Sequence, residues 1–157
     1  MYIKQRQLDN LGELLSPGKA LVILGPRRCG KTTLLKQFLE KTDLKHLFVT
    51  GEDIAVQNYL ASQSVQKLTS FVGDNKLLVI DEAQKIAGVG LNLKLIIDHM
   101  PGIRIVATGS SSFDLARGVG EPLTGRKYTL HLYPLAQLEL TAIENAAVTR
   151  ANLESRL

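Results

Sequence analysis

Residues 20–34, with the sequence ALVILGPRRCGKTTL, decide the fold of this chain. A short apolar run from Ala20 to Leu24 is followed by GPRRCGKT over residues 25–32, and the apolar pair Leu34 and Leu35 then begins a helical pattern. This is the pattern GxxxxGK[ST] between a strand and a helix, the setting in which such a loop cradles phosphate groups. The stretch therefore predicts a strand, a phosphate-binding loop and a helix, and with them a site for a nucleoside triphosphate.

Each fixed position of the loop has a physical task. Gly25 and Gly30 lack a Cβ, which lets successive backbone N–H groups converge on one phosphate. The helix that begins near Lys31 adds its positive end, the lysine ammonium reaches the β- and γ-phosphates, and the Thr32 hydroxyl coordinates the Mg²⁺ that bridges them. The expected nucleotide-binding residues are Gly25, Pro26, Arg27, Arg28, Cys29, Gly30, Lys31, Thr32 and Thr33. The alternative, a glycine-rich turn that happens to contain Lys-Thr, does not explain four fixed positions in the correct setting.

An acidic pair follows a second strand pattern. The segment KLLVIDEAQKI covers residues 76–86, and its run from Leu77 to Ile80 is continuously apolar, as expected of a strand buried on both faces of a parallel sheet. Asp81 and Glu82 follow at the carboxyl end of the strand, where ligands bind in open α/β sheets. We expect Asp81 to hold Mg²⁺ and Glu82 to orient or deprotonate an attacking water, which suits hydrolysis better than phosphoryl transfer to a small acceptor. A solvated acidic pair at a strand end is the plainer alternative.

Polar residues also end the next predicted strand, Ile103 to Ala107. TGSSS occupies residues 108–112, and a polar side chain beside the acidic pair can reach a γ-phosphate or the attacking water. Thr108 is the first candidate for this sensing role and Ser110 is the second. For the serines, capping a helix that begins near Ser112 is an equally good interpretation.

Arg126 is the remaining candidate for the site. It lies just before the last predicted strand, residues 128–135, at the end of a glycine-rich loop over residues 117–126. A planar guanidinium suits a γ-phosphate or a partner carboxylate, and a surface salt bridge is the commoner role of such an arginine. Both roles stay open from the sequence.

The rest of the chain supplies the expected scaffold. A further strand is predicted at residues 46–50, and helices are predicted at 4–15, 31–41, 53–73, 91–100 and 141–157. Within 53–73, the expected inward side chains are Ile54, Val65, Leu68 and Phe71. His46, His99 and His131 lie far apart in the sequence, so we expect structural roles for them and no metal site.

Composition places the chain among single-domain globular proteins. Its 157 residues are 45% hydrophobic and 22% charged, and no apolar run reaches the ~18 residues of a membrane span. The N-terminus lacks a signal-peptide core and the chain has one cysteine, so we expect a cytoplasmic location and no membrane partner. The net charge of +4 leaves nucleic-acid binding open, but no basic run or aromatic platform provides a motif for it.

Four segments together resemble one family. They are GPRRCGKTTLLKQF, LLVIDEAQKI, IVATGSSSFDL and LTGRKYTLHLYPL, and they occur in the order found in the prokaryotic AAA-type ATPases whose ATPase domain precedes a domain of unknown function. The resemblance runs from about Tyr2 to Leu140. It implies an α/β fold, the three-layer α/β/α sandwich of P-loop NTPases, with a mainly parallel five-stranded sheet in strand order 5-1-4-3-2. In this family Lys31 and Thr32 match the phosphate-loop pair, Asp81 and Glu82 the metal-binding and catalytic carboxylates, Thr108 the sensor region, and Arg126 the GR position.

The resemblance also implies ATP with Mg²⁺ as the ligand and suggests a domain division. Residues 1–140, including the helix at 4–15, are expected to form the ATPase domain. Residues 141–157 are expected to form a terminal helix, the start of a C-terminal region that family members continue into and that this chain lacks.

We favour hydrolysis of ATP to ADP, with a water positioned by Glu82. An arginine that completes the site is expected from a neighbouring subunit of a homo-oligomer or from a partner protein. The alternative is a nucleotide-operated switch or interaction module, in which ATP and ADP control partner binding with little turnover. A small-molecule kinase is disfavoured, because the loop at 117–126 is a poor candidate for a kinase lid.

Overall fold

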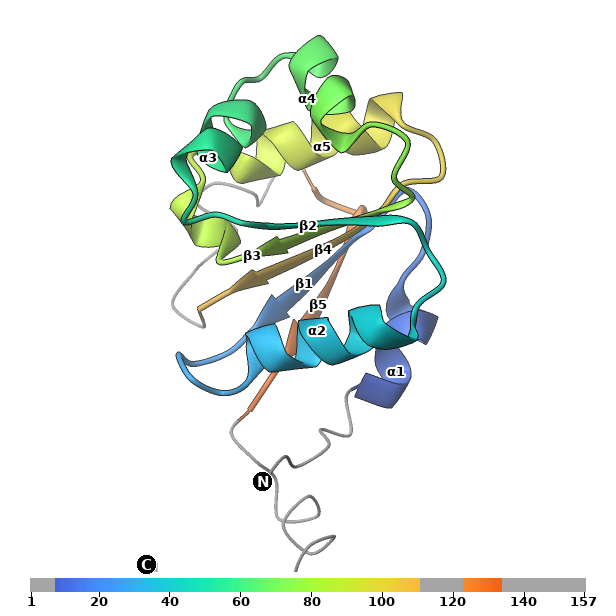
Figure 1. The fold of residues 1–157 in the computed structure, drawn as a ribbon, viewed down its shortest axis with the longest axis vertical. Coiled ribbons are helices and arrows are strands. Elements are labelled where there is room, and N and C mark those ends of the chain that lie inside the picture. The colour runs from blue at the N-terminus through green and yellow to red at the C-terminus, as the bar shows by residue number, and fades with distance from the viewer. Residues whose placement is uncertain (1–7, 111–122, 134–157) are drawn as a thin grey trace, which may run out of the picture.

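The computed structural model describes residues 8–110 and 123–133 of the chain (Figure 1). The elements on the first half are α1 (Leu8–Leu14), β1 (Ala20–Leu24), α2 (Lys31–Lys41), β2 (His46–Thr50), α3 (Ile54–Leu60) and α4 (Val65–Val72). The second half adds β3 (Leu77–Asp81), the short 3-10 helix η1 (Ala83–Lys85), α5 (Val89–His99), β4 (Arg104–Gly109) and β5 (Lys127–His131). The predicted helix at 141–157, Ser112 and most of the loop at 117–126 lie outside the described residues.

The described strands form one five-stranded sheet in the order β2-β3-β4-β1-β5. Each of its four pairings is parallel. Read from the β5 edge, this is the order 5-1-4-3-2, so the predicted fold class is confirmed. Since the strands are parallel, their carboxyl ends all lie on the same side of the sheet. We call this side, which runs across the strand ends, the carboxyl edge, and it carries the candidate site.

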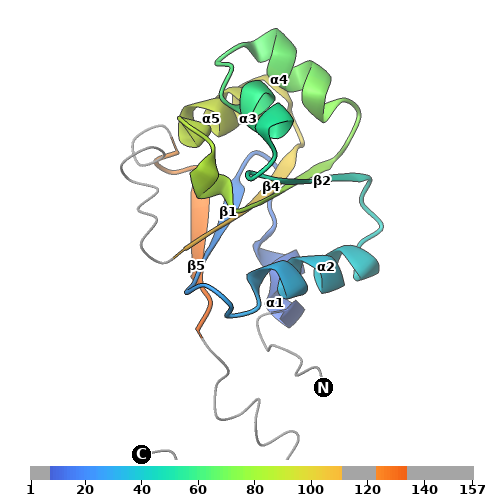
Figure 2. The ribbon, with the colours of Figure 1, turned by 60° about the vertical axis from the view of Figure 1, so that its left-hand side comes forward.

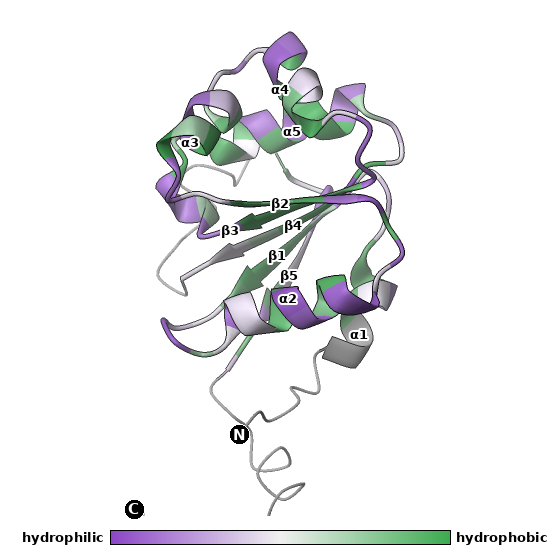
Figure 3. Ribbon diagram, in the orientation of Figure 1, coloured by the Kyte–Doolittle hydropathy of each residue, from purple (hydrophilic) through white to green (hydrophobic). Residues whose placement is uncertain are grey.

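Helices cover both faces of the sheet. Figures 1 and 2 show α1 and α2 on one face and α3, α4 and α5 on the other. The alternation along β1 explains this: Leu21 and Ile23 belong to the core beneath α1 and α2, whereas Ala20 and Val22 belong to the core beneath the other three helices. In Figure 3 the apolar colour runs along the central strands, as expected of a sheet buried on both faces.

The predicted helix at 53–73 is wrong in its continuity, because the structure breaks it into α3 and α4. Gln63 takes a left-handed conformation, with φ 51°, and its N–H donates to Asn92 Oδ1 on α5 at 2.8 Å. Ser64 then caps α4. The prediction that Ile54 points inward is also wrong, since its side chain is 72% exposed. Ile54 is the first residue after the Asp53 cap, and the buried positions of α3 are instead Val56 and Leu60.

The other expected inward positions of this segment are partly right. Leu68 is buried, whereas Val65 and Phe71 are only half-buried. The ring of Phe71 stacks against Tyr59, with 5.0 Å between the ring centroids. This contact joins α4 to α3 across the break between them.

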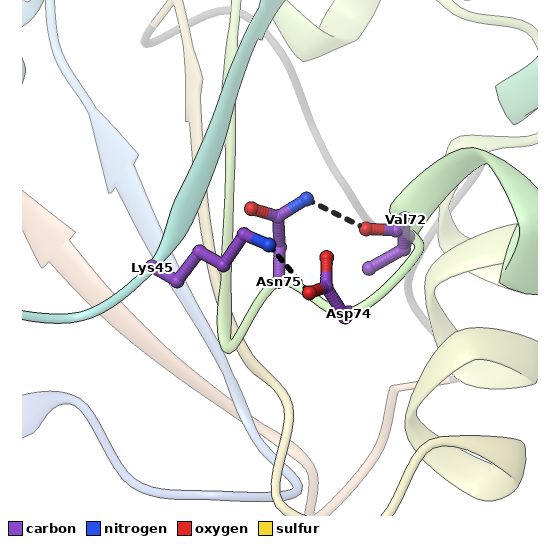
Figure 4. A network of polar contacts seen from close by, with 4 residues as sticks. All are labelled: Lys45, Val72, Asp74 and Asn75. Atoms are coloured by element: carbon purple, nitrogen blue, oxygen red, sulfur yellow. Dashed lines mark hydrogen bonds and ion pairs between the residues drawn. The ribbon is translucent and has the colours of Figure 1, made fainter.

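A polar network ties the starts of β2 and β3 together at the amino edge of the sheet (Figure 4). Lys45 forms an ion pair with Asp74, and the hydrogen bond to Lys45 is the largest cause that lowers the pKa of Asp74. The side chain of Asn75 donates to Val72 O at 2.8 Å, and Lys76 N donates to Lys45 O, also at 2.8 Å. These bonds fix the register in which β2 and β3 reach the opposite edge.

Within the described residues, no helix combines the length and apolar character needed to cross a bilayer.

Candidate functional site

The loop after β1 has the backbone that its glycines predict. Gly30 has φ 92° and Arg28 has φ 64°, so two residues of the loop are left-handed before α2 begins at Lys31. Gly25 lies in a tight space, since a Cβ built on it would be 2.6 Å from Leu132 O and 2.7 Å from Cys29 Sγ. The loop is therefore built closely around Gly25, and a larger residue there would displace its wall.

Lys31 lies inside the curve of this loop. Its side chain is 5% exposed, and Nζ donates to Gly25 O at 2.9 Å and to Pro26 O at 2.8 Å. These two bonds use two of the three N–H groups of the ammonium. The charge is thus held at the mouth of a helix N-terminus, where a phosphate group would meet it together with backbone N–H groups.

Asp81 connects the loop to the sheet. Its carboxylate accepts a hydrogen bond from Thr32 Oγ1 at 2.6 Å through Oδ2, and one from Thr108 Oγ1 through Oδ1. Asp81 is 6% exposed and Thr108 is 1% exposed, so the arrangement is largely shielded from solvent. The structure therefore brings together three predicted site residues from α2, β3 and β4.

Thr108 has different partners from those that the prediction of phosphate sensing assumed. Its hydroxyl donates to Asp81 and accepts the backbone N–H of Glu82 at 3.0 Å. A threonine hydroxyl carries a single proton, so a hydrogen bond from Thr108 to a phosphate oxygen would require the bond to Asp81 to break. In the described structure Thr108 instead fixes the positions of both acidic residues.

Glu82 begins a sharp turn at the end of β3. It has φ 53° and ψ 43°, a left-handed conformation that a non-glycine residue seldom adopts. Its carboxylate accepts a hydrogen bond from Gln84 Nε2. On the other side, Gly51 N donates to Asp81 O at 2.7 Å, and a Cβ on Gly51 would lie 2.4 Å from Glu82 O. The peptide between the two acidic residues is thus held on both sides, by Gly51 after β2 at its carbonyl oxygen and by Thr108 of β4 at its N–H.

Arg126 is not brought to this site. β5 pairs with β1 so that Lys127 lies beside Ala20, at the opposite edge of the sheet from the loop. The length of β1, roughly 16 Å at about 3.3 Å per residue, separates the two places. The guanidinium forms an ion pair with Asp98 of α5. The expected contact with a γ-phosphate is therefore not available within one chain, and Arg126 has the second of the two roles left open.

The remaining predicted residues differ in exposure. Pro26, Arg27, Arg28 and Thr33 are exposed, Ser110 is half-buried, and Cys29 is buried within the loop. Arg27 and Arg28 thus place exposed positive charge within the loop.

Two residues of the site were missed from the sequence. Gly51 directly follows β2 at the carboxyl edge of the sheet, and a glycine in that place is a sign of close backbone approach. Gln84 lies two residues after Glu82, and the turn that folds it back could not be foreseen. The position of Gly51 was a usable signal, whereas the contact of Gln84 depends on the left-handed backbone of Glu82.

The oxygen atoms at and beside Asp81 are suitable ligands for a hard cation. A hydroxyl and a carboxylate are the oxygen ligands that Mg²⁺ prefers, and Mg²⁺ in phosphate sites takes its other ligands from the substrate and water. Residues 8–110 and 123–133 contain no group of three His, Cys, Asp or Glu side chains that could hold a metal by themselves. The residues present therefore fit a cation that binds together with a phosphate ligand.

Comparison with known proteins places this geometry in a family. Residues 17–141 match the model of a family described as AAA domain. An uncharacterized protein of Methanocaldococcus jannaschii is 29% identical over 139 residues, which cover 87% of this chain and 31% of that protein. A proteasome-associated ATPase of Geodermatophilus obscurus is 31% identical over 102 residues, covering 62% of this chain and 17% of that protein. The chain thus spans about a third or less of the length of these relatives.

A likeness among solved structures agrees at the level of fold. The crystal structure of Pif1 helicase from Candida albicans superposes with a TM-score of 0.57 and 15% sequence identity. The match covers 88% of this chain and 42% of the helicase chain. At that identity the likeness concerns the fold alone.

Proposed function

This chain belongs to the AAA domain family, and from that membership we propose that it binds ATP with Mg²⁺ at residues 25–32 and hydrolyses the ATP to ADP. The observation that carries the proposal is the position of Asp81, hydrogen-bonded to Thr32 of the phosphate loop and to Thr108 of β4. A metal-binding carboxylate must stand beside the loop hydroxyl for one cation to contact both.

Substrate binding is assigned to the loop. Its backbone N–H groups, the N-terminus of α2 and the buried ammonium of Lys31 supply positive potential for the triphosphate. Thr32 and Asp81 would hold Mg²⁺, which neutralises charge on the phosphate oxygens when it is bound. Family membership supports nucleotide binding in general, and the choice of ATP is part of the proposal.

The catalytic step is assigned to Glu82. Its carboxylate follows the metal-binding residue directly and is half-buried, so it can accept a proton from a water that attacks the γ-phosphorus. We assign Thr108 an indirect part, because its hydroxyl holds the carboxylate of Asp81 and the backbone N–H of Glu82. Thr108 would then act by positioning the two acidic residues.

The test is an ATP titration and an ATPase assay on the wild-type chain and two variants. Lys31→Ala should lose ATP binding, and Glu82→Gln should retain ATP affinity while kcat falls about 10²- to 10⁴-fold. Lys36→Ala and Glu40→Gln, both on the exposed side of α2, are the matched controls and should behave as the wild type. Unchanged turnover in Glu82→Gln would refute the catalytic assignment.

One observation favours a second candidate, a nucleotide-operated switch with little intrinsic turnover. Two arginines of the described residues, Arg104 at the start of β4 and Arg126 just before β5, lie at the edge opposite the loop. Neither of these two arginines is placed to stabilise the transition state at the loop of its own chain, and an arginine from another subunit or protein would complete the site. ADP release measured at low and high protein concentration, and with added DNA, separates the two. Tight ATP binding with no turnover in any of these conditions favours the switch.

Other assignments remain predictions. A cytoplasmic location and the division into residues 1–140 and 141–157 stay as the sequence indicates them. Nucleic-acid binding is suggested only by the net charge of +4.

A further inference from the structure

The carboxylate of Glu82 has a partner that neither the phosphate loop nor the metal-binding residues supply. Gln84 Nε2 donates a hydrogen bond to Glu82 Oε2, across a separation of two residues. Both side chains are half-buried at the carboxyl edge of the sheet. This contact therefore lies within the site itself.

The backbone explains how two such close residues meet. The left-handed conformation of Glu82 ends β3 and starts η1, whose second residue is Gln84. Lys85 N donates to Glu82 O at 3.0 Å and closes this turn. The strained turn thus brings the two side chains together.

The orientation of the Gln84 amide is decided by charge. Its NH₂ group faces a carboxylate that has only acceptors, so the reverse orientation would place oxygen against oxygen. The other end of the amide, Oε1, is a buried atom with no donor among the described residues. Buried acceptors without a partner are uncommon and call for an explanation. The amide donates to Glu82 in an orientation that leaves its own Oε1 without a hydrogen-bond donor.

We propose that Gln84 is a positioning residue that holds the carboxylate of Glu82 in one orientation, with Oε2 bonded to Gln84 and Oε1 left to accept the proton of the attacking water. This inference rests on the proposed hydrolysis by Glu82 and deepens it. Glutamate has three side-chain torsions, and a base is effective only while it stays within hydrogen-bond reach of the proton that it removes. The backbone N–H bond to Thr108 fixes one end of Glu82, and Gln84 fixes the other.

The decisive variants change the donor and keep the size of the side chain. Gln84→Met has similar length but cannot donate, and Gln84→Glu has the same shape but turns the donor into a second carboxylate. Lys85→Met is the matched control, because Lys85 is the exposed neighbour on η1. ATP affinity is measured by titration, kcat by steady-state hydrolysis at saturating ATP, and folding by the thermal midpoint.

We expect kcat to fall about tenfold in Gln84→Met and further in Gln84→Glu, with ATP affinity within about twofold of the wild type and the control unchanged. A second comparison uses the Glu82→Gln background. If Gln84 acts only through the carboxylate, Gln84→Met causes no further loss of kcat there.

The inference is overturned if Gln84→Met keeps kcat within about twofold of the wild type. It is also overturned if ATP affinity falls in parallel with kcat, or if the loss is equally large in the Glu82→Gln background, since either result indicates a structural role. A wild-type chain that binds ATP without any Glu82-dependent turnover removes the proposed hydrolysis as well. That outcome differs from failure of the inference alone, in which the wild type is active and the Gln84 variants match it.

Discussion

Thr32 Oγ1 donates a hydrogen bond to Asp81 Oδ2 at 2.6 Å, although the two residues lie 49 positions apart in the chain. The bond joins the first turn of α2 to the end of β3, which belong to different crossover units of the sheet. The phosphate loop and the acidic edge are therefore one structural unit. Both of these oxygen atoms are ligands that one hard cation can take at the same time.

The first prediction concerns metal dependence. Asp81→Asn keeps the shape of the side chain but removes its charge, so ATP affinity measured with Mg²⁺ should fall about tenfold and approach the affinity measured with a chelator. Thr32→Val should act in the same direction because it removes the hydroxyl. Thr129→Val, on the exposed side of β5, is the control. If the Asp81 and Thr32 variants retained the full effect of Mg²⁺ on affinity, the cation would bind elsewhere.

The second prediction concerns Gly51. A Cβ at this position would lie 2.4 Å from the backbone oxygen of Glu82, so Gly51→Ala must push β2 and the acidic turn apart. We expect a loss of about 1–3 kcal/mol in the free energy of unfolding and a lower kcat. The measurements are urea denaturation and the ATPase assay.

Gly12→Ala provides a matched comparison for Gly51→Ala. Gly12 lies within α1, and a Cβ there meets no atom within 4 Å. Since alanine favours helix over glycine by up to about 1 kcal/mol, the Gly12 variant should be as stable as the wild type or more stable. Equal behaviour of the two alanine variants would show that the close approach at Gly51 is easily relieved.

The sequence was sufficient for the sheet and for the parts of the site that follow strand ends. The run Leu77 to Ile80 is apolar at every position, and this leaves a buried parallel strand as the natural interpretation. The position of Asp81 beside the loop follows from that strand, because carboxyl ends of parallel strands share one edge. No local pattern could supply the strand order, which was predicted from the family resemblance.

The rest depended on contacts between residues distant in sequence or on unusual backbone angles. The break between α3 and α4 is held by Asn92, which lies 29 residues from Gln63. The contact of Gln84 depends on a positive φ at Glu82, which glutamate seldom adopts. The partner of Arg126 depends on where β5 joins the sheet. None of these features has a signature in the local pattern of apolar and polar residues.

The third prediction concerns the hydroxyl of Thr108. Thr108→Val keeps the volume but leaves the N–H of Glu82 without its acceptor and Asp81 Oδ1 without its donor, in a place that is 1% exposed. We expect a loss of about 1–3 kcal/mol in the free energy of unfolding, together with a lower kcat. Thr108→Ser keeps the hydroxyl and should restore most of both. A serine variant as impaired as the valine variant would mean that the methyl group, and not the hydroxyl, is what matters.

The fourth prediction concerns Arg126 and separates a role within one chain from a role between chains. Because Arg126 lies at the edge opposite the loop and pairs with Asp98, Arg126→Ala should leave ATP affinity unchanged at low protein concentration. The ion pair is partly exposed, with side-chain accessibilities of 41% and 31%, so its loss should lower the free energy of unfolding by no more than about 1 kcal/mol.

If a neighbouring subunit supplies Arg126 to the loop, kcat of the wild type rises with protein concentration and kcat of Arg126→Ala does not. Mixing Arg126→Ala with Lys31→Ala would then recover activity, because the first chain provides an intact loop and the second an intact arginine. No recovery at concentrations where the wild type self-associates would assign Arg126 to the fold alone.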